Sequence, residues 1–392
     1  MEYSNMDLHD LTCIFGFFYS FFQVIRTSAL TSVMNLPQIR EFFMLIIIVC
    51  TLLLIPKSRF SKKEWFIFLI CFLIFLLNSI VSSTIVLLMN ILLVYSFGKH
   101  PQKINKFVRC VLLGLICGVI LIITLAVLGI IPNHFRVQGG RARYSLGFAS
   151  PVALPDTYVG IIVCHIFLNK NKIKKTSLLL LLIPSIIIMQ LTDGRSSFGI
   201  SLIIIMGIIF LGNLNEERRI RMIKYLSSFS VLLLFFGILF SIYAAINFEN
   251  SSFLLDLDSL FTGRFYWFSQ AWTQTSVLPF GNNVFEADER ITLDNIYLTL
   301  ILRGGIFVFL VFVMSIIKLI SYLKNRKDYI SFIVIIAILV NSIVSASWMP
   351  IWKNAFIFCL SDMIFHKYEI LYPHIQLKHR QIFADKQISK QF

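Results

Sequence analysis

Long hydrophobic stretches separated by short polar clusters recur along almost the whole chain. A bilayer is crossed by about 20 consecutive apolar residues in a helix. The pattern predicts spans near residues 10–27, 40–56, 65–80, 81–98, 109–131, 151–168, 177–192, 197–212, 226–247, 296–322, 329–347 and 354–367. We therefore expect an all-α, polytopic transmembrane helical bundle with about twelve spans.

The third and fourth spans come from one uncharged run over residues 65–97, which is too long for a single helix across a bilayer. The run contains a polar patch that predicts the turn of a helical hairpin. The patch consists of Asn78, Ser79, Ser82, Ser83 and Thr84.

Basic residues fall mainly in every second loop. Of the 35 Lys and Arg residues, 25 lie in alternate loops and the C-terminal tail, and 10 lie in the intervening loops. The positive-inside rule then predicts that both termini are cytoplasmic, with a large external loop between spans nine and ten. The net charge of +15 is explained by this topology, so we expect no nucleic-acid partner.

Composition supports one integral membrane domain over residues 1–392, because 57% of residues are hydrophobic and only 14% are charged. No Lys or Arg precedes Arg26, so we expect the first apolar run to remain as a span. The Cys and His residues are scattered without metal-binding spacing, and we expect no metal or other cofactor. We expect any functional site outside the membrane to lie in the two large external loops, 132–150 and 248–295.

Nine of the ten cations assigned to the outside are arginines, whose forked guanidinium binds phosphate or carboxylate through two hydrogen bonds. These cations are Arg26, Arg40, Arg136, Arg141, Arg143, Arg195, Arg264, Arg290, Arg303 and Lys353. In the 132–150 loop, two glycines at 139 and 140 permit a sharp turn inside the arginine cluster. That cluster suits either a diphosphate or ordinary lipid head groups.

Asp193-Gly194 predicts a tight turn in which Arg195 pairs with Asp193. Ser196 and Ser197 are placed to cap the next helix, and a ligand contact there is equally open. Farther on, the aromatic spacing in "RFYWFSQAW" predicts a packed helix that begins at Arg264. A cation is unfavourable at the start of a helix unless an anion is nearby.

Carboxylates gather before span ten. Glu286, Asp288 and Glu289 are expected to be solvated, whereas Asp294 stands at the entry of the span. It is a candidate helix cap and also a candidate general base. Arginines beside a carboxylate suit displacement of a lipid diphosphate by a sugar hydroxyl, because the cations neutralise the leaving group.

The order of short motifs resembles the O-antigen and capsular polysaccharide polymerase family (Wzy type) and the related O-antigen ligases. The motifs are "GRAR", "DGRSS", "TGRFYW", "PFGN" and "DNIYL" followed by "GGI", between about residues 136 and 312. The resemblance implies a membrane enzyme on the outer face of the bacterial cytoplasmic membrane. It would transfer a growing glycan from undecaprenyl diphosphate onto the next lipid-linked repeat unit.

By motif match, the diphosphate would be bound by arginines, with Gly281 in the turn that follows and Asp294 and Arg264 at the catalytic position. The expected diphosphate-binding residues are Arg136, Arg141, Arg143, Arg195, Arg264 and Arg290. The ligases carry a histidine where this chain has Asp294, which favours a polymerase. A ligase, a flippase for lipid-linked oligosaccharide and a structural or sensory protein remain as alternatives. A chain-length regulator and a flippase of the same pathway are the expected protein partners, with membrane lipids around the bundle.

Overall fold

The computed structural model describes residues 7–32, 37–58, 60–83, 85–138, 141–170, 172–261, 263–283, 293–346 and 348–365. Most of these residues are helical. The α-helices are α1 Leu8–Arg26, α2 Pro37–Leu54, α3 Lys62–Ser82, α4 Ile85–Phe97, α5 Pro101–Val127, α6 Ala153–Asn169, α7 Lys175–Thr192, α8 Arg195–Asn213, α9 Glu216–Asn247, α10 Ser252–Leu260, α11 Arg264–Gln274, α13 Ile296–Thr299, α14 Gly305–Arg326, α15 Tyr329–Asn341 and α16 Cys359–Phe365.

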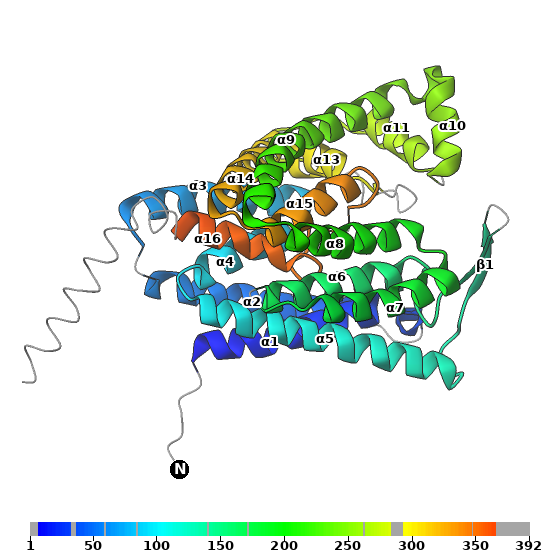
Figure 1. The fold of residues 1–392 in the computed structure, drawn as a ribbon, viewed down its shortest axis with the longest axis horizontal. Helices are drawn as coiled ribbons and strands as arrows, with labels where there is room; N and C mark the ends of the chain where they lie inside the picture. The colour runs from blue at the N-terminus through cyan, green and yellow to red at the C-terminus, as the bar shows by residue number, and fades with distance from the viewer. Residues whose placement is uncertain are drawn as a thin grey trace, which may run out of the picture.

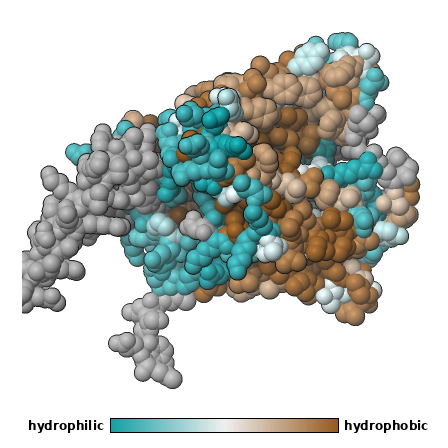
Figure 2. Space-filling model, in the orientation of Figure 1, coloured by the Kyte–Doolittle hydropathy of each residue, from teal (hydrophilic) through white to brown (hydrophobic). Residues whose placement is uncertain are grey.

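Eight of the described helical segments are long and apolar enough to cross a membrane, and four shorter apolar helices accompany them. This confirms the prediction of a multi-pass helical membrane protein. On the face shown in Figure 2, hydrophobic side chains cover the middle, and many hydrophilic ones gather toward the end where α1 begins. Such a band is expected where lipid chains replace water as the solvent.

The bundle is layered. Helix α1 packs on α2 and α5, α5 packs on α6, and α6 packs on α7 and α8. Helix α15 then joins α8 to α9, which lies along α14. The β-hairpin of the 132–150 loop, α10 and α11 all lie at one end of this bundle, opposite the N-terminus (Figure 1). We call this the hairpin end.

Small residues allow α1 and α5 to approach closely. A Cβ added at Gly118 would lie 2.8 Å from the Cβ of Val24. The Ser20 hydroxyl donates across the interface to the carbonyl of Val111 at 3.0 Å. Close backbone approach and interhelical hydrogen bonds are how helices associate where lipid removes the hydrophobic driving force.

The turn between α3 and α4 is shorter than the polar patch predicted. Helix α3 continues to Ser82, and Ser83 then takes a left-handed conformation with φ 53°. Ser79 and Ser82 stay helical because their hydroxyls donate to carbonyls one turn earlier, at 2.8 Å in both cases. Asn78 is likewise inside the helix, completely buried.

The 132–150 loop contains the one departure from all-α structure in the described residues. Strand β1 (Phe135–Gln138) pairs antiparallel with β2 (Arg141–Tyr144). The register sets Arg136 opposite Arg143. The arginine cluster therefore lies on two paired strands that flank the two glycines.

The loop over 248–295 contains the helices α10 and α11, followed by a non-helical segment over residues 275–283. Helix α11 begins at Arg264, as predicted, and buries Phe265 and Phe268 completely. These rings pack with Phe248, Leu254 and neighbours on α9. The aromatic spacing therefore reflects packing, as expected.

The tenth predicted span is broken near the hairpin end. A π-helical turn, Leu300–Gly304, separates α13 from α14, and Gly305 has φ +81°. The first amides of α14 are satisfied by the loop before it, because Ile306 donates to Leu278 at 3.1 Å and Phe307 to Pro279 at 3.2 Å.

Asn78 fastens this loop to the helix break. Its amide nitrogen lies 2.9 Å from the carbonyl of Phe280 and 3.0 Å from the carbonyls of both Arg303 and Gly304. Gly281 completes the junction with φ +84°, and a Cβ there would lie 2.6 Å from the carbonyl carbon of Arg303. Three segments far apart in sequence therefore meet at one buried point.

Gly281→Ala is expected to destabilise the protein by about 2 to 4 kcal/mol, because it adds a left-handed alanine and a clash with backbone. Thermal unfolding in detergent measures the effect. Gly199→Ala on α8 is the matched control, since nothing lies within 4 Å of its Cβ position. Equal melting temperatures for the two variants would contradict this packing.

Candidate functional site

Arg264 connects three segments at the hairpin end. Its Nε lies 3.9 Å from Oδ2 of Asp294, and Nη1 donates to the carbonyl of Val344 after α15. The start of α11 is held by Asp258, whose carboxylate accepts from the amide of Phe265 at 2.7 Å. The cation at the helix start is therefore accompanied by an anion, as its position required.

Asp294 is not the cap of the helix that follows. Asn295 is that cap, and its Oδ1 accepts from the amide of Leu298 at 2.9 Å. The Asn295 amide nitrogen donates to Ser241 at 2.8 Å and to the carbonyl of Ile343 at 2.7 Å. Asp294 was a candidate helix cap and a candidate general base. Because Asn295 is the cap, only the role of general base remains for Asp294.

The Asp294 side chain is 55% exposed. The protein around it nevertheless raises its pKa above the ordinary value, chiefly because neighbouring atoms displace part of the water that would solvate the charged form. Arg264 opposes this effect, Asp156 adds to it, and Lys353 opposes it. A raised pKa in a carboxylate beside an arginine is the kind of tuning found at sites of proton transfer.

A second group of charges surrounds Asp193, which ends α7 in a left-handed conformation. Its carboxylate accepts from Nε of Arg195 at 2.7 Å and lies 3.4 Å from Nη2 of Arg143. The predicted Asp193–Arg195 pair is confirmed. The structure thus brings a hairpin arginine and a helix arginine to one carboxylate, which leaves an excess of positive charge.

Asp156 was not predicted from sequence, and Lys353 was predicted only as a cation on the outer side; the two form a pair at this end of the bundle. Ser197 donates to Oδ1 of Asp156 at 2.6 Å, and Nζ of Lys353 lies 3.3 Å from Oδ2. Ser197 therefore binds a side chain and does not cap α8, which begins after Gly194 without a side-chain cap. An acidic residue in the first turn of the apolar α6 was the available signal.

This pair lies between the two arginine groups. Both of its charges act on Asp294, and Pro155, next to Asp156, packs against Gly194 in the turn that holds Asp193. The hairpin end therefore carries a connected set of charges that runs from the β-hairpin to α11.

A cleft of about 310 Å³ opens at Leu293, the residue before Asp294. Residues that line it include Asn78, Leu87, Leu293, Thr299, Arg303 and Met349. Arg303, whose place in the tenth span was undecided from sequence, belongs to the π-helical turn and faces this cleft. Arg303 and Leu293, the residue before Asp294, therefore line the same cleft.

The remaining predicted residues are placed only in part. Arg136 and Arg141 lie in the two paired strands, and the structure describes their backbone alone. Arg290 and the acidic residues Glu286, Asp288 and Glu289 fall outside the described residues. Among the described residues, no three His, Cys, Asp or Glu side chains form a group that could hold a metal ion.

Comparison of the chain with protein-family models, curated proteins and solved structures finds no significant match. The site must therefore be interpreted from its own geometry. It offers an exposed carboxylate with a raised pKa, the guanidinium of Arg264 beside it, and a cleft lined by Arg303 and by Leu293, the residue before Asp294. That set can accept a proton from a hydroxyl and stabilise a polyanion in the same place.

Proposed function

We propose that the protein is a polysaccharide repeat-unit polymerase of the bacterial cytoplasmic membrane. It would join lipid-linked oligosaccharides on the outer face, with about twelve spans and both termini in the cytoplasm. The observation that carries the proposal is the contact between Arg264 and Asp294, whose carboxylate is relieved of capping by Asn295. The Asp294 carboxylate is therefore available as a base and lies beside the Arg264 cation.

The proposed reaction is a displacement at the anomeric carbon of the donor glycan. Asp294 takes the proton from a hydroxyl of the acceptor repeat unit, whose oxygen forms the new bond to that carbon. The bond from carbon to the diphosphate oxygen breaks, and undecaprenyl diphosphate leaves with the electron pair. Arg264, beside Asp294, and Arg303, in the cleft, would neutralise the negative charge that develops on the leaving group.

Transfer to another acceptor and transport across the membrane are the competing functions. A ligase would share the displacement chemistry but pass the finished glycan to a different lipid. A flippase would need cations along a central path through the spans. The gathering of arginine–carboxylate pairs at the hairpin end favours chemistry at one surface.

Deletion of the gene separates the three functions. A polymerase mutant is expected to display only single repeat units on its surface lipid or cell wall. Loss of all surface glycan would instead indicate a flippase, and full-length polymer left on its lipid carrier would indicate a ligase. Either of these outcomes would reject the proposal.

The neighbours of Asp294 predict opposite shifts in the pH dependence of polymerisation. Because the base form is lost as pH falls through the raised pKa of Asp294, activity should decline on the acid side. Lys353→Met removes a cation that lowers this pKa, so the acid limb should move to higher pH. Asp156→Asn removes an anion that raises it, so the limb should move to lower pH. Initial rates of polymerisation measured from pH 4 to pH 8 give the test, and shifts in the same direction would contradict the assignment.

A further inference from the structure

A pocket lined by lysines lies at the end of the bundle opposite the hairpin end, where α9 begins and α14 ends. Its volume is about 230 Å³. We call it the basic pocket. Three ammonium groups from two helices border it, and none of its described lining residues carries a carboxylate. The lining consists of Ile220, Ile223 and Lys224 on α9 and of Lys324, Asn325 and Lys327 at the end of α14.

The charges of these lysines are balanced only weakly within the protein. Nζ of Lys327 lies 3.8 Å from Oε1 of Glu216, but the two side chains are 56% and 70% exposed, so water screens their attraction. Among the described residues, Lys224 and Lys324 form no ion pair. Because like charges that border one cavity repel each other, a bound anion would stabilise this arrangement.

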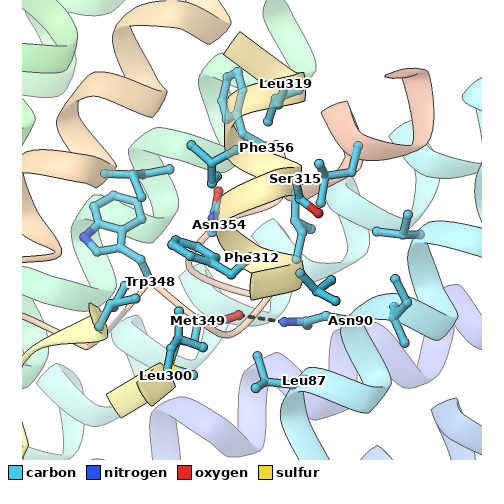
Figure 3. A pocket seen from close by; sticks show the side chains of 18 of the residues that line it. Leu87, Asn90, Leu300, Phe312, Ser315, Leu319, Trp348, Met349, Asn354 and Phe356 are labelled. Atoms are coloured by element: carbon cyan, nitrogen blue, oxygen red, sulfur yellow. Dashed lines mark hydrogen bonds between the residues drawn. The ribbon is translucent and has the colours of Figure 1, made fainter. Parts of the chain in front are cut away.

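Charge distinguishes the basic pocket from the pocket inside the bundle. The inner pocket lies between α4 and α14 and is lined mainly by apolar side chains such as Leu87, Phe312 and Leu319 (Figure 3). Its polar lining residues, such as Asn90 and Ser315, are uncharged, and none of the described residues around it is a cation. Of these two pockets, the basic pocket is therefore the one suited to an anion.

The basic pocket lies where two membrane-spanning segments end. The helical segments Glu216–Asn250 and Ile296–Arg326 are both long and apolar enough to cross a bilayer. On α9, Phe235 and Leu239 follow Lys224 by about three and four helical turns, so they lie near the same face of the helix. Their side chains are 45% and 66% exposed. A lipid whose phosphate lies at Lys224 would find an apolar surface for its acyl chains along this face.

We propose that the basic pocket binds the phosphate group of an anionic membrane lipid. Lysine ammonium groups each offer three donors to phosphate oxygens, and the amide of Asn325 offers a neutral donor. The positive-inside rule accounts for cations in these two loops, but it does not require them to border one cavity. The site is separate from the proposed chemistry at Asp294. In the proposed topology it lies at the cytoplasmic leaflet, where anionic lipids attract basic pockets between spans.

Lipid binding to the purified full-length protein tests the ligand. The protein is held in an uncharged detergent and titrated with phosphatidylglycerol or phosphatidylcholine, and native mass spectrometry measures the bound lipid. Phosphatidylglycerol is expected to bind about tenfold or more tightly than phosphatidylcholine. Equal binding of the two lipids would overturn the proposal. Displacement of phosphatidylglycerol by an equal concentration of glycerol phosphate would assign the pocket to a soluble phosphate and would also overturn it.

A matched pair of charge variants tests the place of binding. One variant replaces the three lysines of the basic pocket with glutamine and should weaken phosphatidylglycerol binding about tenfold or more. The control should bind as the wild type does, and equal weakening in both would show a general attraction to charge and reject the pocket. The control makes the same change at three exposed lysines between α6 and α7, at the same end of the bundle, namely Lys172, Lys174 and Lys175.

Asn325→Phe tests the cavity itself, because it fills the basic pocket and leaves every lysine in place. Phosphatidylglycerol binding should weaken about tenfold or more in this variant. Asn213→Phe adds the same ring at an exposed position at the end of α8 and should bind as the wild type does. Unchanged binding in Asn325→Phe would reject the pocket. Each assay measures lipid binding alone, so its outcome is independent of whether the protein is a polymerase.

Discussion

Replacing Arg264 with alanine is expected to abolish long-chain polymer while the protein still accumulates in the membrane. The substitution removes the cation beside Asp294 and the donor to Val344. Loss of one group that stabilises charge in a transition state costs about 10² to 10³ in rate. Glycan length on gels and the rate of the purified protein measure the effect.

Lysine at position 264 is expected to rescue polymerisation poorly. A lysine keeps the charge, but a single ammonium does not reproduce the forked geometry that contacts a carboxylate and a carbonyl at once. Full rescue by lysine would reduce the role of Arg264 to simple charge.

Arg326→Ala is the matched control for this variant. Arg326 also pairs with a carboxylate, Asp362, at 3.1 Å, but at the opposite end of α14. Polymer length should be unchanged in this variant. Equal loss in both variants would mean that removal of any arginine–carboxylate pair disrupts the protein.

Asp294→Asn is expected to reduce polymerisation by about 10² to 10⁴, the usual contribution of a positioned general base. Asparagine keeps the size of the side chain but does not take up the proton. Because Asn295 already caps α13, the folded state should lose little stability. Wild-type activity in this variant would remove Asp294 from the chemistry.

Asn295→Ala tests whether Asn295 supplies the helix cap while Asp294 supplies the base. It removes the cap and the two donations to Ser241 and Ile343. Loss of a cap costs about 0.5 to 2 kcal/mol, so this variant should melt at a lower temperature than Asp294→Asn. The reverse order of melting temperatures would return the capping role to Asp294.

The helices could be predicted from the apolar pattern because a membrane span is a local property of sequence. Each of the twelve predicted ranges overlaps a described helix, and eight helical segments reach the length and hydropathy of a span. The count of twelve spans and their orientation remain part of the proposal. The polar patch at 78–84 misplaced a turn because Ser79 and Ser82 satisfy their hydroxyls within the helix.

The site could be predicted from sequence only where the interacting residues are close together in the chain. Arg264 at a helix start and the Asp193–Arg195 turn follow from short motifs. The partner of Asp156 was not predictable, because Lys353 lies 197 residues away in the chain. Asn78 was taken for a turn residue for the same reason, since its three partners belong to segments more than 200 residues later.

The most direct test is a reaction with purified protein in liposomes, supplied with lipid-linked repeat units and a chelator. The account predicts glycans of several repeat units and release of undecaprenyl diphosphate, with neither product formed by Arg264→Ala or Asp294→Asn. Repeat units that stay single in the presence of the wild-type protein would contradict it. Movement of the intact lipid across the bilayer without joining would contradict it as well.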